Sequence, residues 1–422
     1  MITKEDGSII IDEEFSPVTT PLYELTQLLK RTFYDTFGFL FLLLTLPFLW
    51  LLNKFSPYME KRIMVGTHPI VSNIHYKSIL KDTLKEEYEV DSFIFVDWLN
   101  ESSYYDIKAS DILPKWIIIS NPYAIAPYFI LLWSLRRYKG FWWHMDGAIL
   151  ERTLLWRIEP LLLQLFEKKL IMSAFGADQW SLLQSSHNLN FKLGLASHRK
   201  RYFMMDFKRL ERNYMWAKYA NYISGDFRYL PRVNATSMAH YYIDLENLPF
   251  NINENMDTII ISHFANHPER KGSYAIEAIC KELKSEGYKI EYRAIHGVSR
   301  AEALSILDES HIFIEHLFNG SFGTAALEAS AKGNVVLTNI DKRMIDLFLV
   351  QHYEFYAPFF KNMPIKNIDV TTLKGELIKL VQNKQELKKL IYESREFIEK
   401  ATNNIVGQKE EGNYVIKSVF LT

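Results

Sequence analysis

Cysteine is nearly absent from this sequence. Cys280 is the single one among 422 residues, so no disulfide can form within the chain. Small secreted domains depend on disulfides, whereas a chain without them suits a reducing compartment. Cys280 falls on the apolar side of an expected helix, which favours a small buried hydrophobic residue over a nucleophile.

An excess of charge of either sign is also lacking. Lysine and arginine number 49 and the acidic residues 50, which gives a formal net charge of -1. Such a balance supplies no general attraction to nucleic acid. The sequence has no cluster of histidine and cysteine at zinc-site spacing, and no Asp-x-Asp pair of the kind that holds a diphosphate through a cation. We therefore expect no metal and no other cofactor.

A long uninterrupted apolar run is missing as well. Residues 37–52 (FGFLFLLLTLPFLWLL) form an uncharged run of sixteen, whereas a spanning helix needs roughly twenty residues. Pro47 would kink a helix there. Three arrangements fit: a tilted spanning helix, an in-plane or re-entrant anchor, and a buried helix. Because the run is apolar all round and Trp50 suits an interface, we expect membrane attachment in some form. The expected location is the cytoplasmic face of the inner or cell membrane, with the protein peripheral or anchored by this single segment.

The next part of the chain alternates apolar strands with helical segments. Strands are predicted at 62–65, 92–96, 116–120 and 170–173, and a helix at about 123–138. This alternation is typical of a parallel sheet whose functional loops lie at the carboxyl ends of its strands. Gly66 and Thr67 follow the first of these strands, and a turn that ends at Asp178 follows the last.

A second pattern of strand, loop and helix begins further on. The β-branched run 258–262 predicts a buried parallel strand, and the polar loop 263–270 follows it. A helical pattern then runs to Gly287. Arg270 and Lys271 stand at the start of this helix, where cations and free backbone N–H groups suit a diphosphate. The alternative is a solvated charged turn before an ordinary helix.

A glycine-rich turn follows the next strand. The strand is predicted at 312–314, the turn is 319–323 (NGSFG), and a helix of small residues occupies 324–331. Glu328 lies one turn into that helix, where its carboxylate would face the same opening and accept both hydroxyls of a ribose. The alternative is a glutamate favoured by the helix dipole. That alternative does not account for the adjacent glycines.

These two motifs together resemble the donor-binding domain of family 4 glycosyltransferases and their near relatives. The matching segments are His267-Pro268, Arg270-Lys271-Gly272, Gly320-Ser321-Phe322-Gly323 and Glu328-Ala329-Ser330-Ala331-Lys332-Gly333. The resemblance implies an α/β chain of GT-B fold, with two Rossmann-like domains facing a cleft. It also implies that Lys271, with Arg270, binds the donor's phosphates, that Glu328 binds its ribose, and that the glycine turn with Phe322 shapes the donor site.

One position departs from the family pattern. Many members have a second glutamate, with seven residues between the two, and here that position is Gly320. A branch of bacterial surface-polysaccharide enzymes has glycine there and an Asp-Gln pair upstream, where this chain has Glu315-His316. Glu315 is therefore a candidate for sugar recognition, or it only closes its strand. The resemblance implies transfer with retention of configuration, and the glycine leaves both the donor sugar and that retention open. Metal independence is expected from the missing Asp-x-Asp pair.

The N-terminal half resembles the acceptor domain of the same enzymes. Gly66 and Thr67 match an early loop near the donor phosphates, and Asp178 matches a turn after a mid-domain strand. Asp178 would be a general base in an inverting enzyme, or an orienting acceptor in a retaining one. His144 follows an aromatic strand. It either touches the acceptor or the transferred sugar, or it is a hydrogen-bonded core residue.

The stretch 199–212 (RKRYFMMDFKRLER) is basic and aromatic. It would lie on an anionic lipid surface or hold a lipid-diphosphate acceptor, and the alternative is an amphipathic helix with a solvated basic face. No RNA-binding or DNA-binding motif accompanies it.

We therefore expect an N-terminal extension at 1–60, an acceptor-side domain at 61–235 and a donor domain at 236–400. A last helix at about 400–422 would pack back on the acceptor-side domain. The expected function is transfer of a sugar from a nucleotide-diphosphate sugar to a glycan or lipid-linked acceptor in bacterial surface-polysaccharide assembly. The alternatives are a nucleotide-sugar epimerase of the same fold and an inactive nucleotide-sugar-binding scaffold.

Overall fold

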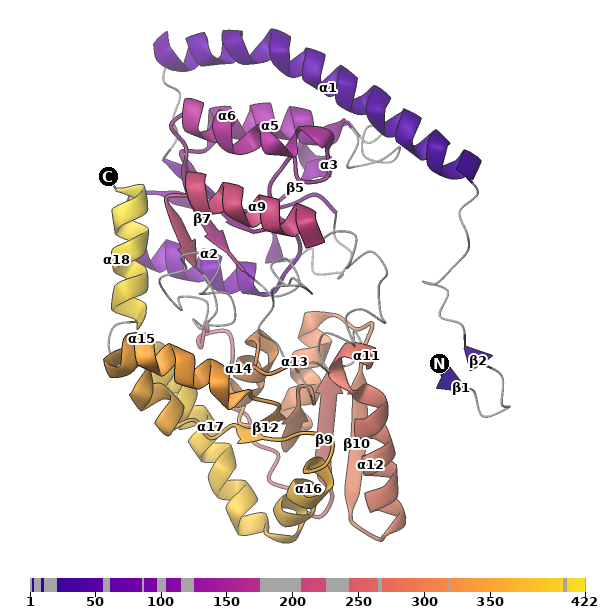
Figure 1. Ribbon diagram of the computed structural model, residues 1–422. Coiled ribbons are helices and arrows are strands. Elements are labelled where there is room, and N and C mark those ends of the chain that lie inside the picture. Colours follow the sequence, from indigo (N-terminus) through magenta and orange to yellow (C-terminus); the bar gives the residue numbers. More distant parts are fainter. Residues whose placement is uncertain are drawn as a thin grey trace.

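Two parallel sheets organise the chain, and helices cover both of them (Figure 1). The computed structural model describes residues 2–3, 9–10, 21–55, 61–85, 87–96, 104–114, 125–174, 206–224, 243–264, 268–317, 319–404 and 408–421. A short antiparallel pair, β1 (Ile2–Thr3) and β2 (Ile9–Ile10), precedes the sheets in the chain. The predicted α/β class is confirmed.

The first sheet has six strands in the order β5-β4-β3-β6-β7-β8, and every pairing is parallel. Its strands are β3 (Arg62–Thr67), β4 (Glu89–Ile94), β5 (Ile107–Lys108), β6 (Gly140–His144), β7 (Lys169–Ser173) and β8 (Tyr222–Ser224). From β3 the chain adds β4 and β5 in one direction, and from β6 it adds β7 and β8 in the opposite direction. The strand order therefore reverses between β3 and β6, and open α/β sheets bind ligands at the carboxyl ends of such strands.

Side chains of the first sheet alternate between two cores. Phe141 and Trp143 of β6 point to one face, and Trp142 points to the other, where its ring stacks on Tyr76 at 4.6 Å between centroids. Period-two alternation with both faces buried is the pattern of a parallel sheet between helices. The covering elements are α2 (Ser72–Thr83), α3 (Ala109–Ile112), α5 (Ala126–Arg137), η3 (Leu154–Arg157), α6 (Glu159–Leu165) and α9 (Asp206–Tyr219).

The predicted strands 62–65 and 170–173 are confirmed, but the one at 92–96 is shifted. The strand β4 begins at Glu89 and ends at Ile94. Its first residues are hard to recognise because Glu89 and Asp91 are acidic, and Arg62 of the adjacent strand pairs with both carboxylates. The predicted strand 116–120 lies outside the described residues.

The second sheet has five parallel strands in the order β10-β9-β11-β12-β13. They are β9 (Ile259–Phe264), β10 (Ile290–Ile295), β11 (Ile312–Ile314), β12 (Val335–Thr338) and β13 (Lys366–Asn367). Its helices are α11 (Pro268–Lys271), α12 (Ser273–Ser285), α13 (Arg300–Glu309), α14 (Thr324–Ala331), α15 (Lys342–Lys361), α16 (Leu373–Gln382) and α17 (Lys384–Asn404). Here the order reverses between β9 and β11, the two strands that precede the predicted donor motifs.

The last helix, α18 (Gln408–Phe420), packs on the first sheet although it follows the second (Figure 1). Val415, Ile416, Val419 and Phe420 join the core that contains Tyr76 and Trp142. The hydroxyl of Tyr88 donates to the carbonyl of Phe420 at 2.8 Å. The two halves of the chain are therefore joined by a returning helix as well as by the connection between the sheets.

The N-terminal extension is one long helix, α1 (Pro21–Phe55), which is longer than the predicted apolar run. Pro47 lies inside it, and the helix continues to Phe55. Its apolar stretch covers Leu28–Phe55, 28 residues with a hydropathy of 1.9, which by length and composition is enough to cross a membrane. The helix is longer than the predicted run of sixteen residues because it extends that run at its amino end, and the three arrangements predicted for it stay open on length alone.

Candidate functional site

The two donor motifs meet where β9 and β11 end. The backbone N–H of Leu317, after β11, donates to the carbonyl of Lys271 at the end of α11, at 3.1 Å. Gly272 lies between α11 and α12 with a φ of 77°, a left-handed conformation that favours glycine. An added Cβ there would lie 3.0 Å from the Leu317 side chain. Glycine thus lets the lysine segment lie directly against the second motif.

His263 of β9 connects β11 to the start of α12 through two hydrogen bonds. Its Nδ1 donates to the carbonyl of Ile314 at 2.7 Å, so its Nε2 accepts from the hydroxyl of Ser273, also at 2.7 Å. Burial, with the nearby charge of Lys271, lowers the pKa of His263 to about 4. The imidazole is therefore neutral at physiological pH, and Lys271 supplies positive charge close to the end of β9. Arg270 lies in α11, but its side chain lies outside the described residues.

The glycine turn is fastened by Glu315. The N–H of Gly323 donates to Oε1 of Glu315 at 2.8 Å, and the hydroxyl of Thr338 donates to Oε2 at 3.3 Å. Gly320 has a φ of 78°, and its carbonyl accepts from the N–H of Asp341 at 2.9 Å. These contacts favour the alternative in which Glu315 closes its strand and shapes the turn.

Phe322, predicted to line the donor site, points into the protein core. Its ring is 1% exposed and packs in the core with Phe313 and Ala326. The turn therefore presents its glycine backbone, while Phe322 fixes the turn to the sheet.

Glu328 lies on α14 and is buried between the two halves of the chain. Its Oε1 accepts from Nη2 of Arg300 at 2.5 Å and lies 3.1 Å from Nε2 of His75, which belongs to α2 of the first sheet. Burial alone would raise the pKa of this carboxyl, but the His75 hydrogen bond and the Arg300 charge outweigh it, so the pKa lies below its usual value. Glu328 is an ionised carboxylate at neutral pH.

The tautomer of His75 follows from its second contact. The backbone N–H of Asp244 donates to Nδ1 of His75 at 3.2 Å, so Nδ1 carries no proton. The proton of the neutral ring is then on Nε2, which donates to Glu328. The carboxylate predicted to bind a ribose is thus held by its own half and by the opposite half of the chain.

His144 lies in the same polar network. Asn73 donates its amide N–H to the carbonyl of His68 at 2.7 Å, so its Oδ1 accepts from Nε2 of His144 at 3.0 Å. His144 is fully buried, and burial lowers its pKa to about 4. Since Asn73 and His75 both belong to α2, this helix links His144 to Glu328. The contacts fit the hydrogen-bonded core histidine that was one of its two predicted alternatives.

Gly66 and Thr67, predicted to follow the first strand, are instead the last two residues of β3, and they lie beside His144. Thr67 donates its hydroxyl to the carbonyl of Gly147 at 2.6 Å. Gly66 has a φ of 135°, and an added Cβ would lie 2.0 Å from the carbonyl oxygen of Phe93. Gly66, Thr67 and His144 thus meet at the point where the strand order of the first sheet reverses. Asp178 lies outside the described residues.

The sequence did not indicate that Arg300 and His75 contact Glu328. Arg300 follows Ser299, whose hydroxyl accepts from the N–H of Glu302 at 3.2 Å, a Ser-x-x-Glu helix start. That signal places Arg300 at the carboxyl end of β10, but nothing local links it to Glu328. His75 reaches its partner from 253 positions away, a contact that only the arrangement of the two halves creates.

Comparison with known proteins identifies the fold. No protein-family model matches the chain, and no curated protein matches its sequence. Sucrose-phosphate synthase from Thermosynechococcus elongatus matches in structure with a TM-score of 0.51 and 13% identity, over 86% of this chain and 99% of that one. HepE of Anabaena, solved with UDP-glucose, matches with a TM-score of 0.51 and 9% identity, over 85% and 99%.

The chain therefore has the GT-B fold, as the resemblance implied. The likeness covers both sheets, and the apolar helix α1 is present as the expected N-terminal extension.

Proposed function

We propose that this protein is a glycosyltransferase that moves a sugar from a nucleotide-diphosphate sugar to a glycan or lipid-linked acceptor in the assembly of surface polysaccharide. One observation carries the proposal. Lys271, the glycine turn 319–323 and Glu328 gather where the strand order of the second sheet reverses, in a chain of GT-B fold. A lysine, free backbone N–H groups and a carboxylate are the groups that a nucleoside diphosphate needs.

Transfer breaks the bond between the anomeric carbon and the diphosphate oxygen and forms a bond from that carbon to an acceptor hydroxyl oxygen, whose proton is released. Negative charge grows on the leaving diphosphate as its bond breaks. Lys271, with Arg270 and the amino end of α14, would stabilise that charge in place of a metal ion. Glu315 would act by holding the turn in its binding conformation. Because these contacts hold the turn before the reaction, the turn needs little reorganisation in the transition state.

Glu328 would bind the ribose through the oxygen that its described partners leave available. Arg300 and His75 both contact Oε1, so Oε2 is the oxygen that would accept from the ribose hydroxyls. His75 would then connect donor binding to the acceptor half, where Asp178 and the basic stretch 199–212 would meet the acceptor, while the buried His144 would hold α2 in place. A lipid-linked acceptor would agree with a membrane position for α1.

Donor binding is the first test of this proposal. Thermal unfolding of the purified protein would be measured with UDP, GDP, dTDP and CMP and their common sugars. A ligand at a hundred times its Kd adds about 2.7 kcal/mol to the stability of the native state. We expect one base to be selected.

Lys271→Ala should lower the affinity for the selected nucleotide by roughly ten to a hundredfold, because it removes a charged hydrogen bond that contributes about 1.5 to 3 kcal/mol. The matched control is Lys281→Ala on α12, whose lysine is 74% exposed beside Glu277 and should leave affinity unchanged. Full affinity and turnover in Lys271→Ala would contradict the donor assignment. Conversion of the donor sugar without acceptor would identify an epimerase, and binding without turnover would identify a scaffold.

A further inference from the structure

The outer face of α1 is apolar and exposed. Leu44 is 77% exposed and Phe48 65%, and only 17% of the most apolar window of the helix is buried. The exposed apolar surface continues onto η3 and α6, through Leu154, Leu161 and Leu165. A contiguous apolar surface of this kind marks a contact with a partner or a membrane.

The opposite face of α1 is fastened along the first half of the chain (Figure 1). Asp35 accepts from the hydroxyl of Tyr128 at 2.5 Å, and Asn53 accepts from Nη1 of Arg136 at 2.8 Å. These two ties are eighteen residues apart, roughly 27 Å along a helix. A helix tied along its side in this way lies flat on its domain, so it meets a bilayer in plane and does not cross it.

Close packing between the ties supports this flat arrangement. An added Cβ at Gly38 would lie 2.1 Å from the ring of Tyr128, so the helix backbone rests directly on α5. The rings of Phe41 and Phe129 lie 4.6 Å apart, and Leu42 is buried in the same core.

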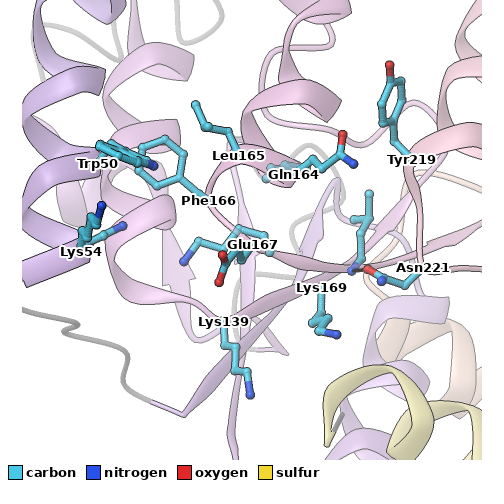
Figure 2. Close-up of a pocket in the computed structure, with 14 residues that line it drawn as sticks. Trp50, Lys54, Lys139, Gln164, Leu165, Phe166, Glu167, Lys169, Tyr219 and Asn221 are labelled. Atoms are coloured by element: carbon cyan, nitrogen blue, oxygen red, sulfur yellow. Dashed lines mark hydrogen bonds between the residues drawn. The ribbon is translucent and has the colours of Figure 1, made fainter.

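A basic pocket opens at the carboxyl end of α1 (Figure 2). It has a volume of about 790 Å³ and lies between α1, the end of α6 and the starts of β6 and β7. Figure 2 shows Trp50 and Lys54 on one side, and Lys139 and Lys169 below them. Four lysines and one glutamate line the pocket, and the fourth lysine, Lys168, donates to the carbonyl of Tyr138 at 2.7 Å.

The pocket is separate from the candidate donor and acceptor site. Lys139 precedes β6 and Lys169 begins β7, whereas His144 and Ser173 end these strands. The pocket therefore lies at the amino edge of the first sheet, and the candidate site lies at its carboxyl edge. A nucleotide bound at the carboxyl edge would not reach the pocket.

We propose that α1 lies in the plane of a membrane and that this pocket binds the phosphate of an anionic lipid headgroup. Three observations select a lipid over another occupant. The apolar face has the hydropathy of a bilayer segment, Trp50 stands where an interfacial aromatic belongs, and a positively charged pocket adjoins the end of the apolar face. Lys54, whose ammonium lies 5.2 Å from the centre of the Trp50 ring, connects the two.

Vesicle flotation of the full chain tests the proposal. The protein would be mixed with vesicles of phosphatidylcholine alone or with added phosphatidylglycerol. We expect stronger binding to the anionic vesicles, and K139Q/K169Q should reduce that binding by about thirtyfold, because each lysine near an anionic surface contributes about fivefold. Binding of the double variant to pure phosphatidylcholine should be unchanged.

Two comparisons separate the face from the pocket. K379Q/K389Q removes the same charge from exposed lysines of α16 and α17 and should bind anionic vesicles like the wild type. L44Q/F48Q should weaken binding to both kinds of vesicle. Equal anionic binding by K139Q/K169Q and the wild type would overturn the pocket assignment.

Other occupants give different results. Binding of soluble glycerol 3-phosphate that K139Q/K169Q abolishes, with equal binding of the wild type to anionic and neutral vesicles, would assign a free phosphate-ester site and overturn the lipid assignment. A dimer in solution that L44Q/F48Q dissolves, with no vesicle binding, would assign the face to a second copy of the chain. None of these measurements uses a donor, so their outcome is independent of the proposed transferase activity.

Discussion

Glu328 shows how much a single residue depends on both halves of the chain. Its carboxylate, buried to 4% exposure, stays ionised because Arg300 and His75 meet it there. A buried ion pair of this kind adds little net stability, but removing one partner leaves an uncompensated charge. The neutral tautomer of His75 fits this balance, since it donates one hydrogen bond to Glu328 without adding charge.

Glu328→Gln should destabilise the protein by about 3 to 5 kcal/mol near neutral pH, because Arg300 then stays buried without a counter-charge. The folded state lowers the pKa of Glu328 below its ordinary value of 4.5. The stabilisation by the ionised carboxylate is therefore complete above pH 4.5 and is lost as the pH falls through the lower folded value.

Urea unfolding of both proteins across this range measures the difference in unfolding free energy. It should shrink as the pH falls below 4.5. A difference that does not change with pH would mean that Glu328 is not the charged partner of Arg300. The nearby Glu302→Gln, at the exposed start of α13, serves as the control.

Individual site residues were predictable to the extent that a local motif contains them. Lys271, the glycine turn and Glu328 belong to short patterns of strand, turn and helix, so the sequence alone was enough to single them out. The two predicted alternatives for Glu315 differ in whether its carboxylate faces a ligand or the turn, and only the Gly323 contact favours one of them. His75 and Arg300 carry no local sign of their contacts.

At the scale of elements, the segment from Glu315 to α14 forms one unit in which a carboxylate holds a turn at the start of a helix. An added Cβ at Gly323 would lie 3.0 Å from Oε1 of Glu315, a contact that pushes the carboxylate or the turn aside. The φ of Gly323 is −121°, so alanine brings no backbone strain. The effect of a methyl group there is therefore confined to the turn.

Gly323→Ala should weaken nucleotide binding about tenfold or more while lowering stability only modestly, since the turn shifts and the core does not. Gly375→Ala in α16 is the matched control, because no atom lies within 4 Å of the added Cβ. That control should instead stabilise the protein by roughly 0.5 to 1 kcal/mol. Calorimetric titration with the selected nucleotide measures the affinity of each variant. Equal affinity in the two variants would argue against a donor role for the turn.

Helices and strands were predicted best where the apolar pattern of a segment and its length indicate the same element. The helix at 324–331 matches its prediction because Gly323 and Gly333 mark both of its ends. The strand β4 was shifted because its acidic residues pair with Arg62, and such pairing is invisible without the neighbouring strand. Helix α1 was underestimated because polar residues such as Lys30, Arg31 and Asp35 interrupt its apolar pattern before the run begins.

The whole molecule is held together by contacts between distant parts of the sequence. α2 reaches Glu328 across the two halves, and α18 returns from the second half to complete a core of the first. The GT-B fold was predictable from motifs and alternation, whereas these two connections needed the three-dimensional arrangement. They imply that the first sheet is incomplete without the end of the chain.

Phe420→Ala tests that dependence. The ring of Phe420 is fully buried, and an added Cβ at Gly140 of β6 would lie 2.5 Å from it, so the aromatic ring rests directly on the strand. Its removal should cost about 3 to 5 kcal/mol, the usual effect of deleting a buried aromatic side chain. Leu421→Ala, at a 37% exposed residue next to it, should change the unfolding free energy by less than about 1 kcal/mol.

The strands that lose hydrogen-exchange protection in Phe420→Ala distinguish a local effect on the first sheet from a general loss of stability. Hydrogen exchange should become faster in β6 and β7 of the Phe420→Ala protein, while β9 and β11 keep their protection, because the described residues of α18 complete a core of the first sheet. Nucleotide binding, proposed for the second sheet, should therefore survive the substitution at a temperature where the first half still folds. Equal loss of protection in β6 and β9 would show instead that the two halves unfold as one unit, with the contact between His75 and Glu328 strong enough to couple them.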